Sequence, residues 1–361
     1  MRPSASSSRP RRGRCGRSGS ADRLSNRQQE RTMGKVRKAV ITAAGRGTRQ
    51  YPASSVLQKE MFPLVDRDGM SKPVIQIIGE EALEAGVEEI CIVTPPGDEA
   101  NYRRYFQRLG AEEAKPFADK EWALAESERL QEFGERLSFV VQETQDGYGH
   151  AVYQAREFVG DEPFLLMLGD HIYISAEDSG RNCARQLIDK YELSGLAAMT
   201  GVQLTPAHLL HLFGTLKGEL LDPLNGFYQV DAIYEKPTEE YALAHLRTPG
   251  LPPGSYLCHF GLHVFPPEIF DALAYHMDNN IREKGEIQLT NSQEYLRTAL
   301  LPAGQYGACT IDGQRFDTGI PYGLMESQIA LALAGVHRAE IVEAMARLLA
   351  EQLQSLSRRG G

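Results

Sequence analysis

The sequence lacks the features that mark membrane proteins and zinc proteins. No apolar run approaches 18 residues, so we expect no segment that crosses a bilayer. The five cysteines are scattered without a C-x-x-C pair, and the nine histidines show no H-E-x-x-H spacing. Zinc sites and disulfide frameworks are therefore not expected, and a reducing cytoplasm is the predicted location.

Positive charge is scarce in most of the chain. Residues 1–32 contain nine Arg and no Lys against Asp22 and Glu30, a net charge of +7, whereas the whole chain has a formal charge of −9. Residues 33–361 therefore carry −16. An acidic body argues against a nucleic-acid partner, whose phosphates need a broad basic face.

The basic segment 1–32 is rich in Ser, Gly and Arg and has almost no large apolar residues. We expect it to be a disordered extension. An Arg-rich transit peptide and a nucleic-acid-binding tail are alternatives. We favour an extension without function that precedes Met33, followed by a catalytic domain at 33–320 and a helical segment at 321–361.

The rest of the chain has an ordinary globular composition, with 42% hydrophobic and 24% charged residues. Strand and helix patterns alternate from residue 37 to residue 170. The predicted strands are 37–45, 87–96, 137–143 and 162–170, and the predicted helices are 72–86, 150–160 and parts of 98–136. This order predicts an α/β fold with a doubly wound, mainly parallel sheet, which binds ligands at the carboxyl ends of its strands.

The second half is less regular. A strand followed by a helix is predicted at 254–273, a short hairpin leading into a loop at 308–319, and helical structure from Pro321. An apolar stripe at helical spacing consists of Ile341, Met345, Leu348, Leu349 and Leu353. Packing on the body and a subunit contact explain this stripe equally well.

A glycine-rich turn follows the first predicted strand, in "AVITAAGRGTRQYPASSVLQKEMFPLV" (39–65). Glycines let backbone N–H groups approach phosphate oxygens, because no Cβ stands in the way. The P-loop motif is absent, and the third glycine of a dinucleotide fingerprint would fall at Gln50. Arg49 can grip a phosphate with two donors and Lys59 can place a point charge, and we expect both at the surface of a polar site. A structural turn with surface charges explains these residues equally simply.

Further motifs follow in order along the chain. They are "KPVIQ" (72–76), "GYGHAV" (147–152), "GD" (169–170), "FGTL" (213–216), "YEKP" (234–237), "GEIQLTNS" (285–292) and "FDTG" (316–319). Together with the glycine-rich turn, this set resembles the sugar-nucleotide pyrophosphorylases over residues 36–335. Among them it is most similar to the bacterial members that use UTP and glucose 1-phosphate.

The resemblance implies a Rossmann-like sheet with a sugar-binding subregion. It also implies transfer of a uridylyl group from UTP to glucose 1-phosphate, giving UDP-glucose and pyrophosphate by Mg²⁺-dependent in-line attack, in an enzyme that forms a homo-oligomer, a dimer or tetramer. Arg49 and Lys59 would be the catalytic cations. The implied nucleotide-binding residues are Ala44, Gly45, Gly47, Thr48, Gln142 and Gly147, and the implied sugar-phosphate residues are Gly214, Glu235 and Lys236.

Two aspartates are the implied metal ligands. Asp170 ends an apolar strand, so its carboxylate is expected at the carboxyl edge of the sheet, and Asp317 precedes Gly319 in a turn. Each is also explained as an ordinary turn residue. His150 and His171 are interpreted as structural, because a phosphate is already a good nucleophile.

Four departures from the family pattern affect the choice of base and sugar. They are Gln58, Tyr148, Asn291 and the stretch "HIYIS" after Asp170. Another sugar-1-phosphate nucleotidyltransferase using dTTP, CTP or GTP is one alternative, and a sugar-nucleotide-binding regulator without catalysis is another. A dinucleotide-dependent oxidoreductase is disfavoured by Gln50.

Overall fold

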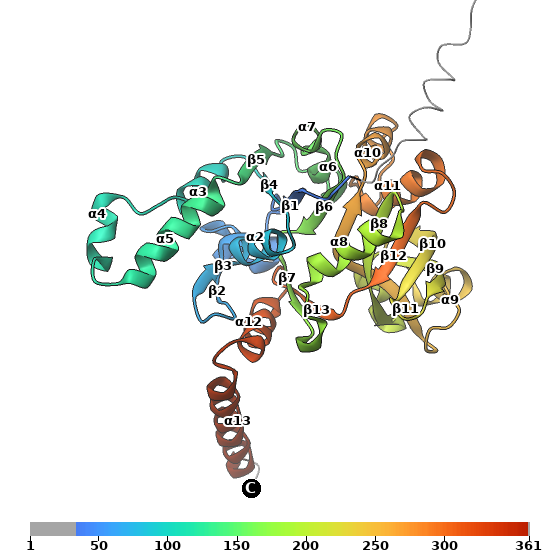
Figure 1. The fold of residues 1–361 in the computed structure, drawn as a ribbon. Coiled ribbons are helices and arrows are strands. Elements are labelled where there is room, and N and C mark those ends of the chain that lie inside the picture. Colours follow the sequence, from blue (N-terminus) through green and yellow to red (C-terminus); the bar gives the residue numbers. More distant parts are fainter. Residues whose placement is uncertain (1–33, 360–361) are drawn as a thin grey trace, which may run out of the picture. The chain divides into compact units, whose positions relative to one another are not determined.

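A nine-stranded sheet organises the structure, a computed structural model that describes residues 34–359 (Figure 1). The strand order is β5-β4-β1-β6-β11-β8-β12-β10-β9. The strands are β1 Lys38–Thr42, β4 Glu89–Thr94, β5 Leu137–Val141, β6 Phe164–Leu168, β8 Ala198–Pro206, β9 Thr215–Asp222, β10 Phe227–Tyr234, β11 Ser255–Phe265 and β12 Tyr306–Thr310. The predictions for segment 1–32 lie outside the described residues.

The four strands from the first half of the chain pair in parallel. β1 lies between β4 and β6, with Lys38 in register with Glu89 on one side and Phe164 on the other, and β5 continues the parallel set beyond β4. Ala39, Val40 and Ile41 of β1 are fully buried, as expected for a strand covered by helices on both faces. The predicted α/β fold is confirmed, with its parallel pairing concentrated in this half.

The remaining strands extend the sheet mostly by antiparallel pairing. β11 is antiparallel to β6, β8 and β9. β10 is antiparallel to both β9 and β12, whereas β12 and β8 are parallel. This mixed half carries the predicted sugar residues, because Gly214 precedes β9 and Glu235 follows β10.

Helices cover the sheet and fill most connections. They are α2 Val74–Glu84, α3 Glu99–Tyr105, α4 Ala111–Ala114, α5 Glu121–Gly134, α6 Tyr148–Tyr153, α7 Arg156–Val159, α8 Cys183–Ser194, α9 Glu239–His245, α10 Glu268–Asp278, α11 Leu289–Tyr295, α12 Gly323–Ala334 and α13 Arg338–Arg359. Shorter turns are η1 Thr48–Gln50, η2 Ala53–Ser55, η3 Lys59–Met61, η4 Lys115–Phe117, η5 Glu177–Ser179, η6 Ala207–Leu212 and η7 Leu296–Leu300. The predicted helix 150–160 is divided into α6 and α7.

Gly86 ends the first long helix as predicted. It adopts φ +93°, and its N–H donates to the Leu83 carbonyl oxygen at 2.9 Å. A residue in this left-handed conformation closes a helix at least cost when it has no Cβ.

Two small sheets stand beside the large one. β2 Pro63–Val65 pairs with β3 Ser71–Pro73, and β7 His171–Ser175 pairs antiparallel with β13 Gly313–Asp317. We call the β7–β13 pair the carboxylate ribbon, because Asp170 immediately precedes β7 and Asp317 ends β13.

The predicted hairpin at 308–319 is wrong. β12 and β13 are consecutive strands, but they belong to different sheets. The Ile311 N–H donates to Val202 of the large sheet, and the Asp312 carbonyl accepts from Ala176 after β7. Alternating residues predict extended backbone but do not specify the partner strand.

The two last helices extend from the carboxylate ribbon. α12 contacts β13, β7 and β2, and α13 contacts α12. In Figure 1, α13 runs away from the sheet beyond α12. Of the helices in the described part, none has the length and apolar character that crossing a bilayer requires.

Candidate active site

The glycine-rich turn lies at the carboxyl end of β1, next to the ends of β4 and β6. The Ala43 N–H donates to the Val93 carbonyl oxygen at 2.8 Å, which ties the start of the turn to β4. The Ala44 carbonyl accepts from the Gln145 amide at 2.8 Å. Gly47 has φ +60°, where a side chain would be strained, and it begins the short turn η1 that carries Thr48 and Arg49.

Lys59 reaches back to this turn from η3. A Cβ built on Gly45 would lie 3.5 Å from both Cε and Nζ of Lys59, an ordinary contact distance, so the ammonium group lies directly beside the turn. The ammonium forms an ion pair with Asp170 Oδ2 and lies 3.5 Å from Glu60 Oε1. Strand β6, through Asp170, therefore positions the cation predicted for catalysis.

The two predicted cations differ in exposure. Arg49 is exposed and makes no hydrogen bond or ion pair with any other described residue. Lys59 is 8% exposed. The expectation that both are surface cations is thus wrong for Lys59, because two carboxylates hold its head group inside the protein.

These buried charges shift each other's protonation. Burial alone would raise the pKa of Asp170, but the His171 hydrogen bond and the Lys59 charge outweigh it and hold the pKa well below its usual range. Burial would lower the pKa of Lys59, but the Asp170 and Glu60 charges raise it. Asp170 is therefore ionised and Lys59 protonated at neutral pH. Burial raises the pKa of Glu60 to about 8 although the Lys59 charge opposes it.

The second predicted metal ligand lies beside the first. The closest ligand atoms of Asp170, His171 and Asp317 all lie within 4.8 Å of one another. The register of the carboxylate ribbon explains this, because His171 pairs with Asp317. Asp317 Oδ1 accepts from the Gly319 N–H at 2.8 Å, which orients its carboxylate.

The site has the donor atoms and the space that a hard divalent cation needs. A Cβ on Gly319 would lie 2.7 Å from Asp170 Oδ2, 3.1 Å from Asp317 Oδ1 and 3.4 Å from Lys59 Nζ. Only glycine leaves the space between these groups open. Both ring nitrogens of His171 are engaged in hydrogen bonds, so the two carboxylates are the appropriate oxygen ligands.

The predicted base-reading residues follow β5. Gln142 is 3% exposed, and its amide nitrogen donates to the Gly147 carbonyl at 3.2 Å and to His150 Nδ1 at 2.9 Å. Gly147 has φ +100°, and a Cβ there would lie 2.7 Å from the Ile287 carbonyl oxygen. The structure thus holds Gln142 and Gly147 together, and His150 supports the amide as a structural residue.

The predicted sugar residues also form one cluster. Lys236 Nζ lies 3.2 Å from Glu235 Oε1, and Glu235 Oε2 accepts from the Thr290 hydroxyl at 2.6 Å. A Cβ on Gly214 would lie 3.2 Å from Thr290 Oγ1 and 2.6 Å from His259 Nδ1. The fold brings Gly214, which precedes β9, close to Glu235 and Lys236, which follow β10, through their shared neighbour Thr290.

The structure adds residues that the motifs did not reveal. His259 contacts the Gly214 position, and burial lowers its pKa to about 4. Arg46, inside the glycine-rich turn, donates from Nε to the side-chain amide oxygen of Gln145. Arg315 of β13 reaches both His171 and the Phe213 ring. Arg46 lies inside the quoted turn and could have been noticed, but His259 and Arg315 belong to no phosphate or sugar motif.

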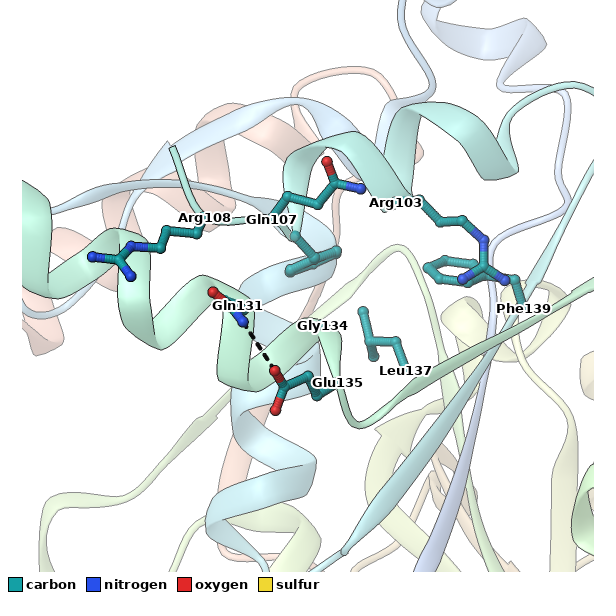
Figure 2. A pocket seen from close by; sticks show the side chains of 9 residues that line it. Arg103, Gln107, Arg108, Gln131, Gly134, Glu135, Leu137 and Phe139 are labelled. Atoms are coloured by element: carbon teal, nitrogen blue, oxygen red, sulfur yellow. Dashed lines mark hydrogen bonds between the residues drawn. The ribbon is translucent and has the colours of Figure 1, made fainter. Parts of the chain in front are cut away.

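A pocket of about 340 Å³ lies elsewhere, between α3, α5 and the edge strand β5 (Figure 2). The Arg103 guanidinium lies 4.7 Å from the centre of the Phe139 ring. Arg103 and Arg108 already pair with Glu99 and Glu128. None of the predicted site residues lines this pocket, and its cations are already paired.

Comparison with known proteins identifies relatives along most of the chain. Residues 38–301 match the nucleotidyl transferase family. The UTP–glucose-1-phosphate uridylyltransferase of Bacillus subtilis is 36% identical over 309 residues, covering 83% of this chain and 92% of that protein.

Solved structures give the same picture. A UTP-bound UGPase from Acinetobacter baumannii is 29% identical with a TM-score of 0.67, covering 87% of this chain and 99% of the other. A UDP-glucose pyrophosphorylase in complex with UDP-glucose is 26% identical with a TM-score of 0.63, covering 82% and 98%.

Proposed function

Because the chain belongs to the nucleotidyl transferase family, we propose that it transfers the uridylyl group of UTP to glucose 1-phosphate, giving UDP-glucose and pyrophosphate. The convergence of Lys59, Asp170 and Asp317 around Gly319 carries this proposal. It joins a protonated lysine and two carboxylates beside a glycine-rich turn, which is the set of charges that a triphosphate and its metal require. The substrates are those for which the Bacillus subtilis relative is named.

The glycine-rich turn holds the triphosphate. Gly45 and Gly47 let backbone N–H groups approach the phosphates, with Ala44 and Thr48 as their neighbours in the turn. Lys59 Nζ already lies at the Gly45 position and neutralises charge on the transferred phosphoryl group. Arg49 has no partner among the described residues, so its guanidinium is available to bind the leaving pyrophosphate.

Gln142 and Gly147 read the uracil edge. The Gln142 amide nitrogen is engaged by Gly147 and His150, so its carbonyl oxygen remains to accept from the N3–H group of the base. The Gly147 carbonyl is used in the same contact, which leaves the Gly147 N–H to donate to a uracil carbonyl.

Glucose 1-phosphate binds in the cluster of Gly214, Glu235 and Lys236. Glu235 accepts hydrogen bonds from sugar hydroxyls, and the missing side chain of Gly214 allows the sugar to approach the backbone. Lys236 is 41% exposed at its side chain and directs its ammonium toward the phosphate. The protein aligns the phosphate oxygen for in-line attack on the α-phosphorus, and this positioning supplies much of the rate enhancement.

Asp170 and Asp317 would hold a Mg²⁺ ion. When bound, the ion would supply positive charge that offsets the charge of the phosphates. Because Asp170 stays ionised and is fixed by Lys59 and His171, its carboxylate needs no reorganisation when the substrates arrive.

The active protein is a homo-oligomer that pairs through α13. Leu348, Leu349 and Leu353 of the apolar stripe are exposed, and Ile341 and Met345 are half-exposed, so the body leaves most of the stripe uncovered. Arg347 and Glu351 are one turn apart, so two antiparallel copies of α13 can place each Arg opposite a Glu.

The cytoplasm is the proposed location, since the described cysteines are free and buried.

The test is pyrophosphate release from a panel of UTP, dTTP, CTP and GTP with several sugar 1-phosphates. The expected result is Mg²⁺-dependent release that is fastest with UTP and glucose 1-phosphate. Faster release with another nucleotide or sugar would replace the base or sugar assignment. Binding of substrates without release under every condition would contradict catalysis.

A further inference from the structure

Arg315 is a buried cation without a counter-ion. It lies on β13 opposite Tyr173 of β7. Its Nε and Nη2 atoms are buried and have no hydrogen-bond partner. It forms no ion pair with a carboxylate in the part of the chain that the structure describes. A buried charge in this state is costly, because the carboxylates of Asp317 and Asp170 act on it without a direct ion pair.

The two side-chain contacts of Arg315 are with the rings of His171 and Phe213, and neither is a carboxylate. Nη1 lies 3.0 Å from His171 Nε2, and the guanidinium carbon lies 4.2 Å from the centre of the Phe213 ring. A guanidinium can only donate, so Nε2 is the acceptor and His171 carries its proton on Nδ1, toward Asp170 Oδ1 at 2.9 Å.

These contacts place Arg315 between the two halves of the site. On one side His171 adjoins Asp170, the proposed metal ligand. On the other side Phe213 adjoins Gly214 of the sugar cluster. In the proposed function the 1-phosphate lies between the sugar cluster and the two aspartates, and Arg315 contacts the sequence neighbour of Asp170 and that of Gly214.

We propose that Arg315 is a phosphate-binding residue that takes the phosphoryl group of the sugar 1-phosphate. This inference rests on the proposed function for the identity of the sugar phosphate. Nε and Nη2 are the two donors on one edge of a guanidinium, and they point in parallel, so they match two oxygens of a phosphate. Burial lowers the pKa of Arg315, although the charges of Asp317 and Asp170 oppose this shift, and a bound phosphate dianion would relieve the unfavourable burial.

The inference makes an unusual prediction about stability. A residue that supports the fold destabilises the protein when it is truncated, whereas loss of an uncompensated buried charge stabilises it. Arg315→Met should therefore raise the thermal midpoint of the ligand-free protein. At saturating UTP it should raise KM for glucose 1-phosphate by about tenfold or more, and it should leave KM for UTP within about twofold.

Two further variants complete the experiment. Arg315→Lys keeps the charge but loses the paired donors, so KM for glucose 1-phosphate should also rise. Arg185→Met is the matched control, since Arg185 is half-buried but pairs with Asp189 and Glu192 away from the site. It should lower the thermal midpoint and leave both KM values unchanged.

Inorganic phosphate provides a readout that does not depend on turnover. It should raise the thermal midpoint of the wild-type protein more than that of Arg315→Met. A stabilisation by phosphate that depends on Arg315 in a protein without turnover would support the anion site and overturn the proposed function. A lower midpoint with unchanged KM for glucose 1-phosphate in Arg315→Met would overturn the inference. If that variant does not fold, an unchanged KM in Arg315→Lys would overturn it equally.

Discussion

At the scale of single residues, Lys59 shows how one side chain serves both the fold and the chemistry. Its ammonium contacts the Gly45 position, Asp170 and Glu60. Asp170 is largely buried and ionised, so it needs a cation beside it, and Glu60, which is 1% exposed, lies next to the same ammonium. Arg49 has no such structural partner, although both cations are proposed to contact the same triphosphate.

Lys59→Ala and Arg49→Ala should therefore have different effects on thermal stability, but both should lower activity. Each should lower kcat by about 10²-fold or more, because lost stabilisation of phosphoryl charge is typically worth a few kcal/mol. Lys59→Ala should also lower the thermal midpoint, since it leaves the ionised and largely buried Asp170 without its cation. Steady-state kinetics and thermal unfolding measure both effects.

Lys35→Ala is a suitable control, because Lys35 is exposed, its ion pair joins Nζ to Glu88 Oε1 at 3.8 Å, and neither residue belongs to the proposed site. It should change neither property. Near-normal turnover of Arg49→Ala would remove Arg49 from the catalytic assignment, and an unchanged midpoint of Lys59→Ala would contradict the structural role of the ion pair.

Asp170→Asn tests the metal assignment. Asparagine keeps the shape of the side chain but removes its charge, so turnover should collapse and the dependence of rate on Mg²⁺ should weaken. Asp317→Asn should have the same effect more mildly. The measurement is initial rate against Mg²⁺ concentration, with folding checked by circular dichroism. A wild-type Mg²⁺ curve for Asp170→Asn would show that Asp170 is not a ligand.

At the scale of elements, a buried carboxyl group joins α2 to α8. Glu81 of α2 is 4% exposed and accepts from the Ala184 N–H at 2.9 Å in the first turn of α8. Burial raises the pKa of Glu81 from 4.5 to about 7, although the Ala184 hydrogen bond opposes the shift. The stability of the contact between these helices should therefore depend on pH.

The sign of that dependence follows from proton binding. Between pH 4.5 and 7 the folded protein keeps a proton on Glu81 that the unfolded chain releases. The free energy of unfolding should therefore fall as pH rises through this window, by roughly 3 kcal/mol at most, and this contribution should level off above pH 7. Glu81→Gln should remove this part of the slope. Urea unfolding at several pH values measures it, and equal slopes in both proteins would contradict it.

The outcome of sequence prediction also varies by element. The parallel strands and α2 could be predicted because their apolar patterns and the glycine after α2 are local signals. The partners of β12 and β13 could not, because pairing is decided by distant strands. For the site, motifs located Gly214, Glu235, Lys236 and both aspartates. Motif spacing did not reveal that Lys59 is buried or that Arg315 lies between the two halves, since both depend on tertiary contacts.

At the scale of the whole molecule, the exposed stripe on α13 predicts self-association. Leu349→Glu places a charge in the middle of the stripe and should shift dissociation to protein concentrations at least about tenfold higher. Ala350→Glu adds the same charge outside the stripe and should leave association unchanged. Sedimentation velocity over a concentration series measures both. A wild-type protein that stays monomeric at tens of micromolar would contradict the interface.

The register of the carboxylate ribbon has a consequence for the natural variation of this chain. Asp317 lies beside Asp170 because it pairs with His171, and alternate residues of a strand point to opposite faces. An insertion or deletion of one codon inside β7 or β13 would turn Asp317 away and separate the pair, whereas the loops that join the elements between these two strands can change in length. Functional homologues should therefore differ in length in such loops and never within β7 or β13.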